Sequence, residues 1–402
     1  MIKFALIKER KTPPDRRVVF SPEKLKLVVQ KFPGASFKIE SSDVRIFTDD
    51  EYHEAGFEVS EDISDCQVLL GVKEVPLPFL IPNKKYFFFS HTIKKQPYNR
   101  DLLREILNKN IELYDHEVIV TQSGHRLIGF GRYAGLVGAY NGFRALGLRD
   151  DLFDLPKVET LPDLKRLLAE LDKINLPNLK IVLTGSGKVA HGAKEIIDHL
   201  NVKQVDISEF LKKEFNEPVY CMIDVMDYNK RKDDGAGTNQ EFYKNPEIYE
   251  SDFMKFARVS KMFIAGHFYG DGAPKFFTKE DCKRPEFKID LIADISCDIN
   301  GPVASTIRPS TIAEPFYGYD PIKEREVDFR EKGAITVMAV DNLPCELPRD
   351  ASEDFGNELM EKVLPSLLEK DREGIIERAT IAEGGKLKPA YAYLQDYVDN
   401  KN

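Results

Sequence analysis

The sequence predicts an α/β protein with two Rossmann-like, doubly wound domains. Short apolar or β-branched runs alternate with longer amphipathic runs along most of the chain. This alternation is typical of βαβ units and of a largely parallel sheet. The chain has 402 residues, whereas a single hydrophobic core stops growing at roughly 250–300 residues. Two domains are therefore expected.

The first alternating series covers residues 1 to 130. Its expected strands are IKFALIK, SFKIES, CQVLLGVK, KYFFFSH and IELYDHEVI. Its expected helices are SPEKLKLVVQKF, TDDEYHEAG and YNRDLLREILNKN. Ser21-Pro22 and Thr48-Asp49 are start signals for the first two helices, because a serine or threonine side chain accepts a hydrogen bond from an unpaired amide of the first turn.

A Gly/Ala-rich stretch, GFGRYAGLVGAYNGFRALG, follows and predicts a connecting helix that packs closely against both halves of the chain. A second alternating series begins at LKIVLTG. The C-terminal stretch ASEDFGNELMEKVLPSLLEK is expected to be helical and to return to the first domain. The predicted first domain is therefore discontinuous (1–131 plus 348–402), the second covers 132–347, and the active site is expected in the cleft between them.

Composition and charge exclude several classes of function. The net charge of −9 argues against a nucleic-acid surface. The longest apolar runs are far shorter than the roughly 20 residues that a membrane-spanning helix needs, and MIKFALIKERK lacks the features of a signal peptide. The cysteines are scattered singly, as in a cytoplasmic protein with reduced thiols. The histidines show no metal-ligand spacing, and no G-x-S-x-G elbow indicates a serine hydrolase. The oligomeric state stays open.

The stretch LKIVLTGSGKVAHGAKE places Gly185 and Gly187 where an expected strand ends, with Gly192 five residues later. In a doubly wound sheet, the first strand-to-helix turn approaches the pyrophosphate of a dinucleotide, and the helix N-terminus offers unpaired N–H groups to it. We expect Gly185 and Gly187 to form this turn and Gly192 to allow close helix–strand packing. The spacing is two residues longer than the common G-x-G-x-x-G, so the flanking strand and helix carry the inference.

Asp206 ends the next expected strand, VKQVD, 21 residues after Gly185. An acid at this point hydrogen-bonds the adenosine ribose hydroxyls, and its charge repels a 2′-phosphate. The sequence therefore predicts a dinucleotide site that favours NAD over NADP.

Several further segments occur in the same order as in the saccharopine dehydrogenases. They are GVKEVP (71–76), FSHTIKKQ (89–96), LYDHE (113–117), GHRLIGFGRYAG (124–135), ADISCDINGP (293–302) and VDNLPCELPRDAS (340–352). Over nearly its whole length, the chain resembles the NAD-dependent, lysine-forming saccharopine dehydrogenases and the lysine–2-oxoglutarate reductase domains. It is more distantly similar to alanine dehydrogenase and the transhydrogenase alpha subunit. The resemblance implies interconversion of saccharopine, NAD and water with L-lysine, 2-oxoglutarate and NADH, by hydride transfer and imine hydrolysis.

This reaction needs a base that faces the substrate nitrogen and a group that handles the protons of the attacking water. Lys73 and His91 lie at the carboxyl ends of expected strands, where ligands gather in α/β sheets. A lysine beside other cations has a depressed pKa, and an imidazole titrates near neutrality. The resemblance implies that Lys73 and His91 are the acid–base pair. Taken alone, each is equally compatible with a solvated or structural side chain.

The substrate carries several carboxylates, so cations are expected around it. The resemblance implies that two arginines bind separate carboxylates, and that two glutamates tune the proton states of Lys73 and His91. Structural ion pairs between these acids and arginines are the alternative. The expected substrate-binding residues are Arg17, Glu74, Gln96, Glu117, Arg126, Phe130, Ser296, Cys297 and Asp298, with Lys94 as a weaker candidate.

The resemblance also extends the cofactor site beyond the glycine turn. Asp341 is expected close to the nicotinamide ribose, and Phe268 is expected to flank the cofactor. The full set of expected NAD-binding residues is Gly185, Ser186, Gly187, Lys188, Val189, Asp206, Ile207, Phe268, Ile295, Val340, Asp341, Asn342 and Leu343.

The chain departs from the patterns of these relatives in three places. Val189 stands where the fungal enzymes can carry a cysteine, so no redox control of the turn is expected. The segment 221–253 is longer than in the fungal enzymes and looks more like the corresponding part of the reductase domain. Three interpretations stay open for it: a lid, a contact surface or a surface insertion. INGPVAST differs from the glycine-rich consensus of the reductase branch, which leaves the exact substrate pair open. The alternatives are a reductase that uses NADPH, an alanine dehydrogenase-like enzyme, and a non-catalytic, transhydrogenase-like component that binds NAD.

Overall fold

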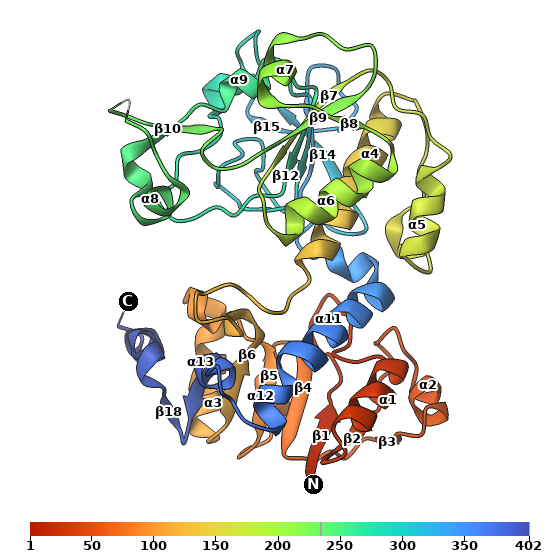
Figure 1. Cartoon of the computed structure of the whole chain (residues 1–402), viewed down its shortest axis with the longest axis vertical. Helices are drawn as coiled ribbons and strands as arrows, with labels where there is room; N and C mark the ends of the chain where they lie inside the picture. The colour runs from red at the N-terminus through yellow and green to blue at the C-terminus, as the bar shows by residue number, and fades with distance from the viewer. Residues whose placement is uncertain (234, 402) are drawn as a thin grey trace. The chain divides into compact units, whose positions relative to one another are not determined.

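The computed structural model describes residues 1–233 and 235–401 and divides into two compact units. Unit 1 comprises Met1–Phe130 and Pro348–Asn402, and unit 2 comprises Gly131–Leu347. Each unit contains a mostly parallel, eight-stranded sheet flanked by helices, which confirms the predicted α/β class (Figure 1). The segment 221–253 is described except for Asp234, which lies outside the described residues.

The sheet of unit 1 has the order β18-β17-β6-β5-β4-β1-β2-β3. Its strands are β1 (Ile2–Leu6), β2 (Ala35–Glu40), β3 (Glu58–Ser60), β4 (Val68–Lys73), β5 (Lys85–Phe89), β6 (Glu112–Asp115), β17 (Thr380–Glu383) and β18 (Lys386–Leu387). The chain runs outward from β1 through β2 to β3, then returns to the other side of β1 with β4. The sheet therefore has a topological switch point between β1 and β4, where ligands bind in open α/β sheets.

Seven α-helices accompany this sheet among the described residues. They are α1 (Pro22–Lys31), α2 (Asp49–Glu54), α3 (Arg100–Asn108), α11 (Pro348–Lys362), α12 (Leu364–Leu368), α13 (Ile375–Ala379) and α14 (Gln395–Asp399). The Ser21 side chain caps α1, and Thr48 forms a capping box with Glu51 at α2. The C-terminal segment joins the sheet, because β17 pairs with β6 and the Val18 amide donates to Ser352 Oγ at 2.9 Å.

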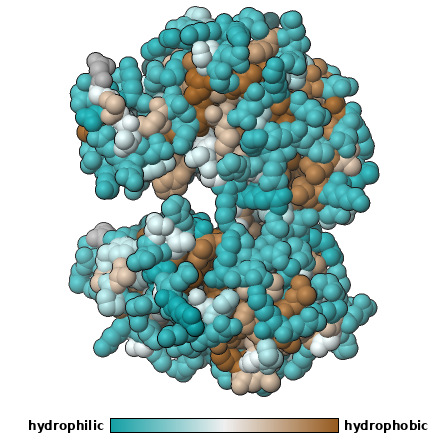
Figure 2. Space-filling model, viewed as in Figure 1, coloured by the Kyte–Doolittle hydropathy of each residue, from teal (hydrophilic) through white to brown (hydrophobic). Residues whose placement is uncertain are grey.

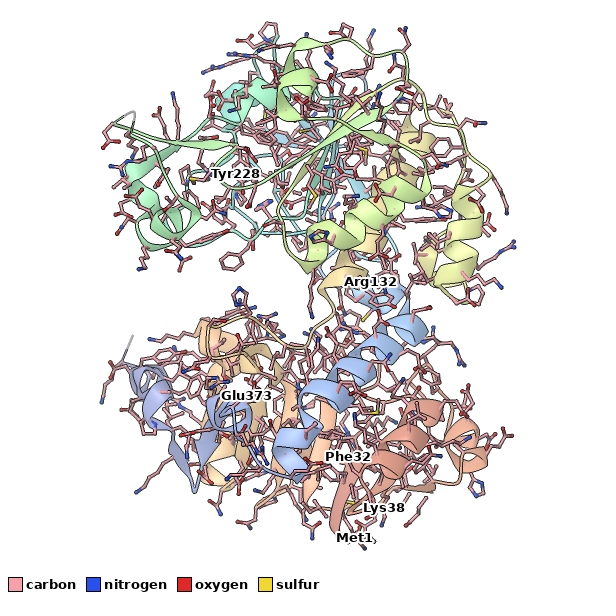
Figure 3. All side chains as sticks on the ribbon, in the orientation of Figure 1. Met1, Phe32, Lys38, Arg132, Tyr228 and Glu373 are labelled. Atoms are coloured by element: carbon pink, nitrogen blue, oxygen red, sulfur yellow. The ribbon has the colours of Figure 1, made fainter. Side chains whose placement is uncertain are left out.

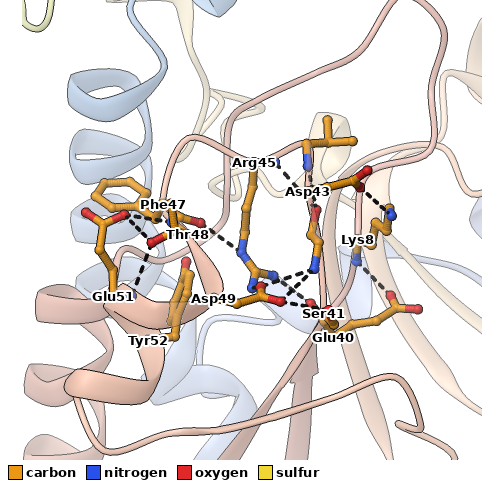
Figure 4. Close-up of polar contacts among 12 residues, drawn as sticks. Lys8, Glu40, Ser41, Asp43, Arg45, Phe47, Thr48, Asp49, Glu51 and Tyr52 are labelled. Carbon is orange, nitrogen blue, oxygen red and sulfur yellow. Dashed lines mark hydrogen bonds and ion pairs between the residues drawn. The ribbon is translucent and has the colours of Figure 1, made fainter.

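A buried arginine closes the corner between β2 and α2 (Figure 4). The Arg45 guanidinium donates to the Glu40 carbonyl at 2.6 Å and to the Phe47 carbonyl at 3.0 Å, and it also bonds Asp49. Its carbon Cζ lies 4.7 Å from the ring centroid of Tyr52. Because every contact of this network is internal to the corner, we assign it a structural role.

The sheet of unit 2 has the order β15-β14-β16-β13-β12-β7-β9-β8. Its strands are β7 (Lys180–Thr184), β8 (Lys203–Gln204), β9 (Val219–Ile223), β12 (Met262–Ala265), β13 (Leu291–Asp294), β14 (Phe316–Asp320), β15 (Arg325–Val327) and β16 (Ile335–Met338). A separate hairpin consists of β10 (Asn229–Arg231) and β11 (Tyr249–Ser251). The expected strand VKQVD is reduced to two residues, and β9 lies between it and β7.

Helices of unit 2 pack closely through glycine. The helices are α4 (Gly131–Arg149), α5 (Leu164–Leu171), α6 (Lys188–His199), α7 (Ile207–Lys212), α8 (Asn239–Lys244), α9 (Met254–Ala257) and α10 (Lys279–Cys282). Arg132 lies in the first turn of α4 (Figure 3). A Cβ added at Gly192 would lie 2.0 Å from its carbonyl oxygen. A Cβ at Gly135 would lie equally close, 2.0 Å, to the Val189 carbonyl oxygen. Gly192 therefore permits helix–helix packing against α4, and the expected helix–strand contact was wrong.

The visible surface is largely hydrophilic, with hydrophobic side chains gathered in separate patches (Figure 2). The largest fully buried side chains are tyrosines and phenylalanines of both units. Within residues 1–233 and 235–401, no helix has the length and apolar character required to cross a membrane.

Candidate functional site

Strand ends bring acid–base side chains to one edge of the unit 1 sheet. Lys73 ends β4, His91 follows β5 by two residues, and Glu117 follows β6 by two residues. The three strands are neighbours in the order β6-β5-β4 and run parallel. Their carboxyl ends therefore share the edge that lies beside the switch point between β1 and β4.

The surroundings of Lys73 favour its neutral amine. Burial is the largest cause of its lowered pKa, and the cations Arg17 and Lys11 lower it further. Asp15 and Glu74 act in the opposite direction without reversing the shift. A neutral amine can accept a proton, so the structure supplies what a base at this position requires.

Two buried side chains hold the backbone at the end of β4. Glu9 Oε1 accepts from the Val72 amide at 2.6 Å, and Glu9 Oε2 accepts from the Lys73 amide at 2.9 Å. On the other side, His116 Nε2 lies 3.0 Å from the Gly71 carbonyl oxygen. We call Glu9 and His116 the β4 clamp. Because successive amides of a regular strand point to opposite sides, a carboxylate that binds both amides marks a departure from the regular pleat.

The pairing of β4 with β5 changes register where the β4 clamp acts. Leu70 pairs with Phe87 and Lys73 pairs with Phe89, so three residue steps on β4 face two on β5. Such a bulge redirects the side chains that follow it. Burial and the neighbouring Asp15 raise the pKa of Glu9 to about 8, although its two amide bonds act against the shift. Sequence reasoning missed both clamp residues.

His91 belongs to a charged cluster around Glu117. The Oε1 atom of Glu117 lies 3.2 Å from Lys94 Nζ and 3.2 Å from Arg126 Nη2, and Oε2 lies 3.4 Å from His91 Nδ1. The last contact is an ion-pair distance without hydrogen-bond alignment. Burial acts to raise the pKa of Glu117, but these three partners outweigh it and lower the pKa to about 2. Glu117 is therefore an anion, and its carboxylate lies beside the imidazole of His91.

The predicted arginines differ in environment. Arg17 is buried and donates from Nε to Asp15 Oδ1 at 3.0 Å and from Nη2 to Asp15 Oδ2 at 2.6 Å. Its carbon Cζ also lies 4.2 Å from the ring centroid of Phe130. Arg126 is exposed and contacts Glu117, which agrees with the alternative expectation of an ion pair between these two side chains. The direct carboxylate contact expected of each arginine stays a prediction.

The two remaining predicted polar residues of unit 1, Glu74 and Gln96, follow Lys73 and His91 in the sequence. Glu74 pairs with Lys11 at 3.1 Å and not with either predicted arginine. The Gln96 side chain accepts from the Tyr98 hydroxyl, and its carbonyl accepts from the Tyr397 hydroxyl. Both are half-buried and lie near the strand ends that carry Lys73 and His91.

In unit 2 the glycine turn lies at the end of β7, as predicted. Gly185 has φ of +102°, and an added Cβ would lie 2.6 Å from the Gly266 carbonyl oxygen. Gly187 precedes the first turn of α6, where an added Cβ would meet no protein atom within 4 Å. Gly185 is therefore required by the protein's own backbone. Gly187 leaves the helix N-terminus accessible to a ligand phosphate, as do its exposed neighbours Ser186 and Lys188.

Asp206 does not end a strand beside the glycine strand, contrary to the expectation, and its contact with the ribose stays a prediction. Its Oδ1 accepts from the Glu209 amide at 2.8 Å and caps α7. The strand before it, β8, is separated from β7 by β9. The following residue, Ile207, is the first residue of α7. An acid next to the glycine turn must therefore come from another strand.

The loops after β12, β13 and β16 complete the same edge of unit 2. Buried Asp294 accepts from Ser296 Oγ and Thr306 Oγ1, both at 2.6 Å, and from the Cys297 amide at 3.2 Å. Cys297 has φ of +56°, its thiol donates to the Ala339 carbonyl at 3.0 Å, and burial raises its pKa to about 12. These hydrogen bonds hold the loop after β13 in place.

The other predicted cofactor residues surround this loop. Ile295 and Leu343 both lie against Gly138 of α4, and Val340 is buried after β16. Asp298 and Asp341 are exposed, Asn342 is half-buried, and Val189 lies in the first turn of α6. Phe268 is 80% exposed on the loop after β12. Among residues 1–233 and 235–401, no group of three or more histidine, cysteine or acidic side chains has a metal-binding arrangement.

The chain is similar to two groups of curated proteins. Residues 5–137 match the alanine dehydrogenase/PNT N-terminal domain family. The mitochondrial alpha-aminoadipic semialdehyde synthase of Bos taurus is 30% identical over 99% of this chain, but the match covers 48% of that protein. The chain thus spans about half the length of such relatives. The saccharopine dehydrogenase (NAD(+), L-lysine-forming) of Candida glabrata is 27% identical over 88% of each chain.

Solved structures with low sequence identity share the fold. An L-alanine dehydrogenase has a TM-score of 0.65 at 15% identity and covers 98% of this chain and 99% of its own. A transhydrogenase from Sinorhizobium meliloti has a TM-score of 0.60 at 14% identity and covers 96% of this chain and 99% of its own. These likenesses confirm the α/β architecture.

Proposed function

The chain belongs to the saccharopine dehydrogenase-like family of the alanine dehydrogenase/PNT superfamily, and from this premise we propose that it is a saccharopine dehydrogenase. It interconverts saccharopine, NAD and water with L-lysine, 2-oxoglutarate and NADH. The observation that carries the proposal is the shared strand-end edge of Lys73, His91 and Glu117. The match to a NAD(+), L-lysine-forming relative over 88% of each chain supports it.

Lys73 acts on the substrate nitrogen. Its lowered pKa supplies a neutral amine, which takes the proton from the secondary amine of saccharopine as the carbon–nitrogen bond is oxidised. The bound nicotinamide supplies the hydride acceptor. In the reverse direction, the ammonium of Lys73 returns the proton to the nitrogen.

His91 acts on the water that hydrolyses the resulting imine. The Nδ1 atom faces the Glu117 carboxylate, whose low pKa keeps it anionic near neutral pH. A carboxylate behind an imidazole stabilises the imidazolium that forms when the ring takes a proton from water. Lys94 and Arg126 on the same carboxylate add positive charge toward the carboxylates of the substrate.

The cofactor-binding part of the proposal lies in unit 2. The first turn of α6 would receive the pyrophosphate, because Gly187 leaves room beside its amides. The loops after β13 and β16 would face the nicotinamide, with Ser296, Asp298 and Asp341 as polar contacts. We propose NAD(H) as the form that binds.

The test is NADH oxidation in the presence of L-lysine and 2-oxoglutarate. Activity with this pair, and much weaker activity with pyruvate and ammonia, is the expected result. Lys73→Met should abolish most of the turnover, whereas Lys85→Met should not. Lys85 is the matched control because it lies at the opposite end of the neighbouring strand and pairs with Glu112. A wild-type preference for pyruvate and ammonia would remove the saccharopine assignment.

The second candidate is a lysine–2-oxoglutarate reductase that uses NADPH. The similarity to semialdehyde synthases over 99% of the chain favours it. It predicts the same substrates, so the comparison of NADH with NADPH at fixed lysine and 2-oxoglutarate separates the two functions.

A further inference from the structure

The strand order of unit 2 changes which acid lies beside the glycine turn. Strand β9 pairs with β7 in parallel over its full length, from Val219 opposite Lys180 to Ile223 opposite Thr184. The Gly185 amide then donates to the Ile223 carbonyl at 2.9 Å. The residue directly after this contact is Asp224. In a doubly wound sheet, the acid that meets the adenosine ribose follows the strand beside the glycine strand.

The strand order separates Asp206 from the glycine turn, because β9 lies between β8 and β7. Gln204 pairs with Tyr220, and the Val205 amide donates to the Tyr220 carbonyl at 3.0 Å. The pairing therefore stops three residues before β9 ends at Ile223. Asp206 follows Gln204 by two residues, about one residue short of the level of Ile223, and two strand spacings of about 4.8 Å place it roughly 10 Å to the side of β7.

Asp224 is held at the edge by its own turn. Its amide donates to Asp227 Oδ2 at 2.7 Å, and its Oδ1 accepts from the Val225 amide at 2.8 Å. Its Oδ2 accepts from Asn239 Nδ2 at 3.1 Å, at the first residue of α8. A carboxylate offers about four acceptor positions. Two protein donors therefore orient the group and leave it able to accept from further hydroxyls.

We propose that Asp224, and not Asp206, accepts from the adenosine ribose hydroxyls and selects NAD(H) against NADP(H), with Asn239 as its positioning residue. The inference rests on the proposed dinucleotide site but not on the choice of amino and oxo acids. A carboxylate accepts from the 2′- and 3′-hydroxyls, whereas it repels the charge of a 2′-phosphate. Asn239 belongs to the segment 221–253, so part of this long segment supports cofactor selection.

The experiment compares Asp224→Ser with Asp206→Ser. Serine is also a good N-cap, so the second variant keeps α7 capped and is a matched control. We would measure the dissociation constants of NADH and NADPH by fluorescence titration, and kcat/KM with both at fixed lysine and 2-oxoglutarate. Loss of a hydrogen bond to a charged group predicts a roughly 10–150-fold weaker NADH affinity for Asp224→Ser. NADPH affinity should stay constant or rise. Asp206→Ser should leave both affinities within about threefold, since its carboxylate does not face the ribose.

A second variant keeps the Asp224 carboxylate, so the proposal can still be tested if Asp224→Ser does not fold. Asn239→Ala should lower the ratio of NADH affinity to NADPH affinity several-fold, while the melting temperature stays unchanged. The assignment is overturned if Asp206→Ser lowers the ratio of NADH affinity to NADPH affinity and Asp224→Ser does not. It is also overturned if the wild-type protein binds NADPH more tightly than NADH. If the wild type bound neither dinucleotide, the dinucleotide site itself would be refuted. If it bound NADH as expected but turned over other substrates, only the proposed reaction would fail.

Discussion

The two units use the carboxyl edges of their sheets in different ways. In unit 1, the edge beside the switch between β1 and β4 presents titratable side chains: Lys73, His91 and Glu117. In unit 2, the edge beside β7 presents backbone, because Gly185 and Gly187 remove the side chains there. Titratable side chains suit proton transfer, whereas exposed amides at a helix N-terminus suit a phosphate. The difference shows how one fold class provides both reactive groups and an anion site.

The largest expected effect comes from removing the reactive side chains of unit 1. Lys73→Met and His91→Gln should each lower kcat by about 10²–10⁴-fold, the usual scale of general acid–base catalysis. NADH affinity should stay nearly constant, because neither residue lies in unit 2. Steady-state kinetics and fluorescence titration measure the two quantities. Near-wild-type turnover in both variants would contradict the division of roles between the units.

The next effect concerns the β4 clamp. In Glu9→Gln, one carboxylate oxygen is replaced by an NH2 group, which cannot accept a hydrogen bond. One of the two bonds from the Val72 and Lys73 amides is therefore lost. Since small misplacements of a reacting group cost up to about 10²-fold, we expect kcat to fall roughly 10–100-fold. Amide hydrogen exchange at Val72 and Lys73 should accelerate in the same variant.

Glu40→Gln is the control for this prediction. Glu40 is as buried as Glu9 and also accepts a backbone amide, from Lys8 at 2.7 Å, but it does not contact β4. It should leave exchange at Val72 and Lys73 unchanged. Faster exchange in Glu9→Gln with unaltered kcat would show that the clamp holds the backbone without affecting catalysis.

A smaller effect separates the two glycines of unit 2. Gly185→Ala should destabilise unit 2 by about 1–3 kcal/mol, because its Cβ would overlap the Gly266 carbonyl at positive φ. Gly187→Ala should leave the melting temperature nearly constant but weaken NADH binding about tenfold, on the same scale of steric cost. Thermal unfolding and NADH titration of both variants provide the measurement. Equal NADH affinity in Gly187→Ala and wild type would show that the ligand does not approach this glycine.

The smallest effect is a pH dependence of stability from His116. Burial lowers the pKa of its imidazole to about 4, whereas an unfolded histidine titrates near 6.5. Between these values the unfolded chain binds more protons than the folded chain, so the free energy of unfolding falls as pH falls. His116→Gln keeps a donor for the Gly71 carbonyl and should reduce this slope by at most about 1.4 kcal/mol per pH unit. Urea unfolding at a series of pH values tests it, and identical slopes would exclude His116 as the titrating group.

Local patterns in the sequence determined the fold class, the strand ends that carry Lys73 and His91, and the glycine turn after β7. Each depends on residues close together in the chain: an apolar run, a cap, or two glycines after a strand. The motifs also identified Glu117 and Arg126, which the structure brings into contact at 3.2 Å. The roles of the individual site residues remain predictions.

Only the tertiary structure decided which strands are neighbours and which buried charges meet. The sequence shows that VKQVD is followed by VYCMI, but not that VYCMI pairs with β7 and displaces the shorter strand. Likewise, Glu9 binds amides 63 and 64 positions along the chain, a contact that no local spacing encodes. Strand order and burial follow from competition among long-range pairings and from the apolar area that each arrangement buries, so they are properties of the folded chain as a whole.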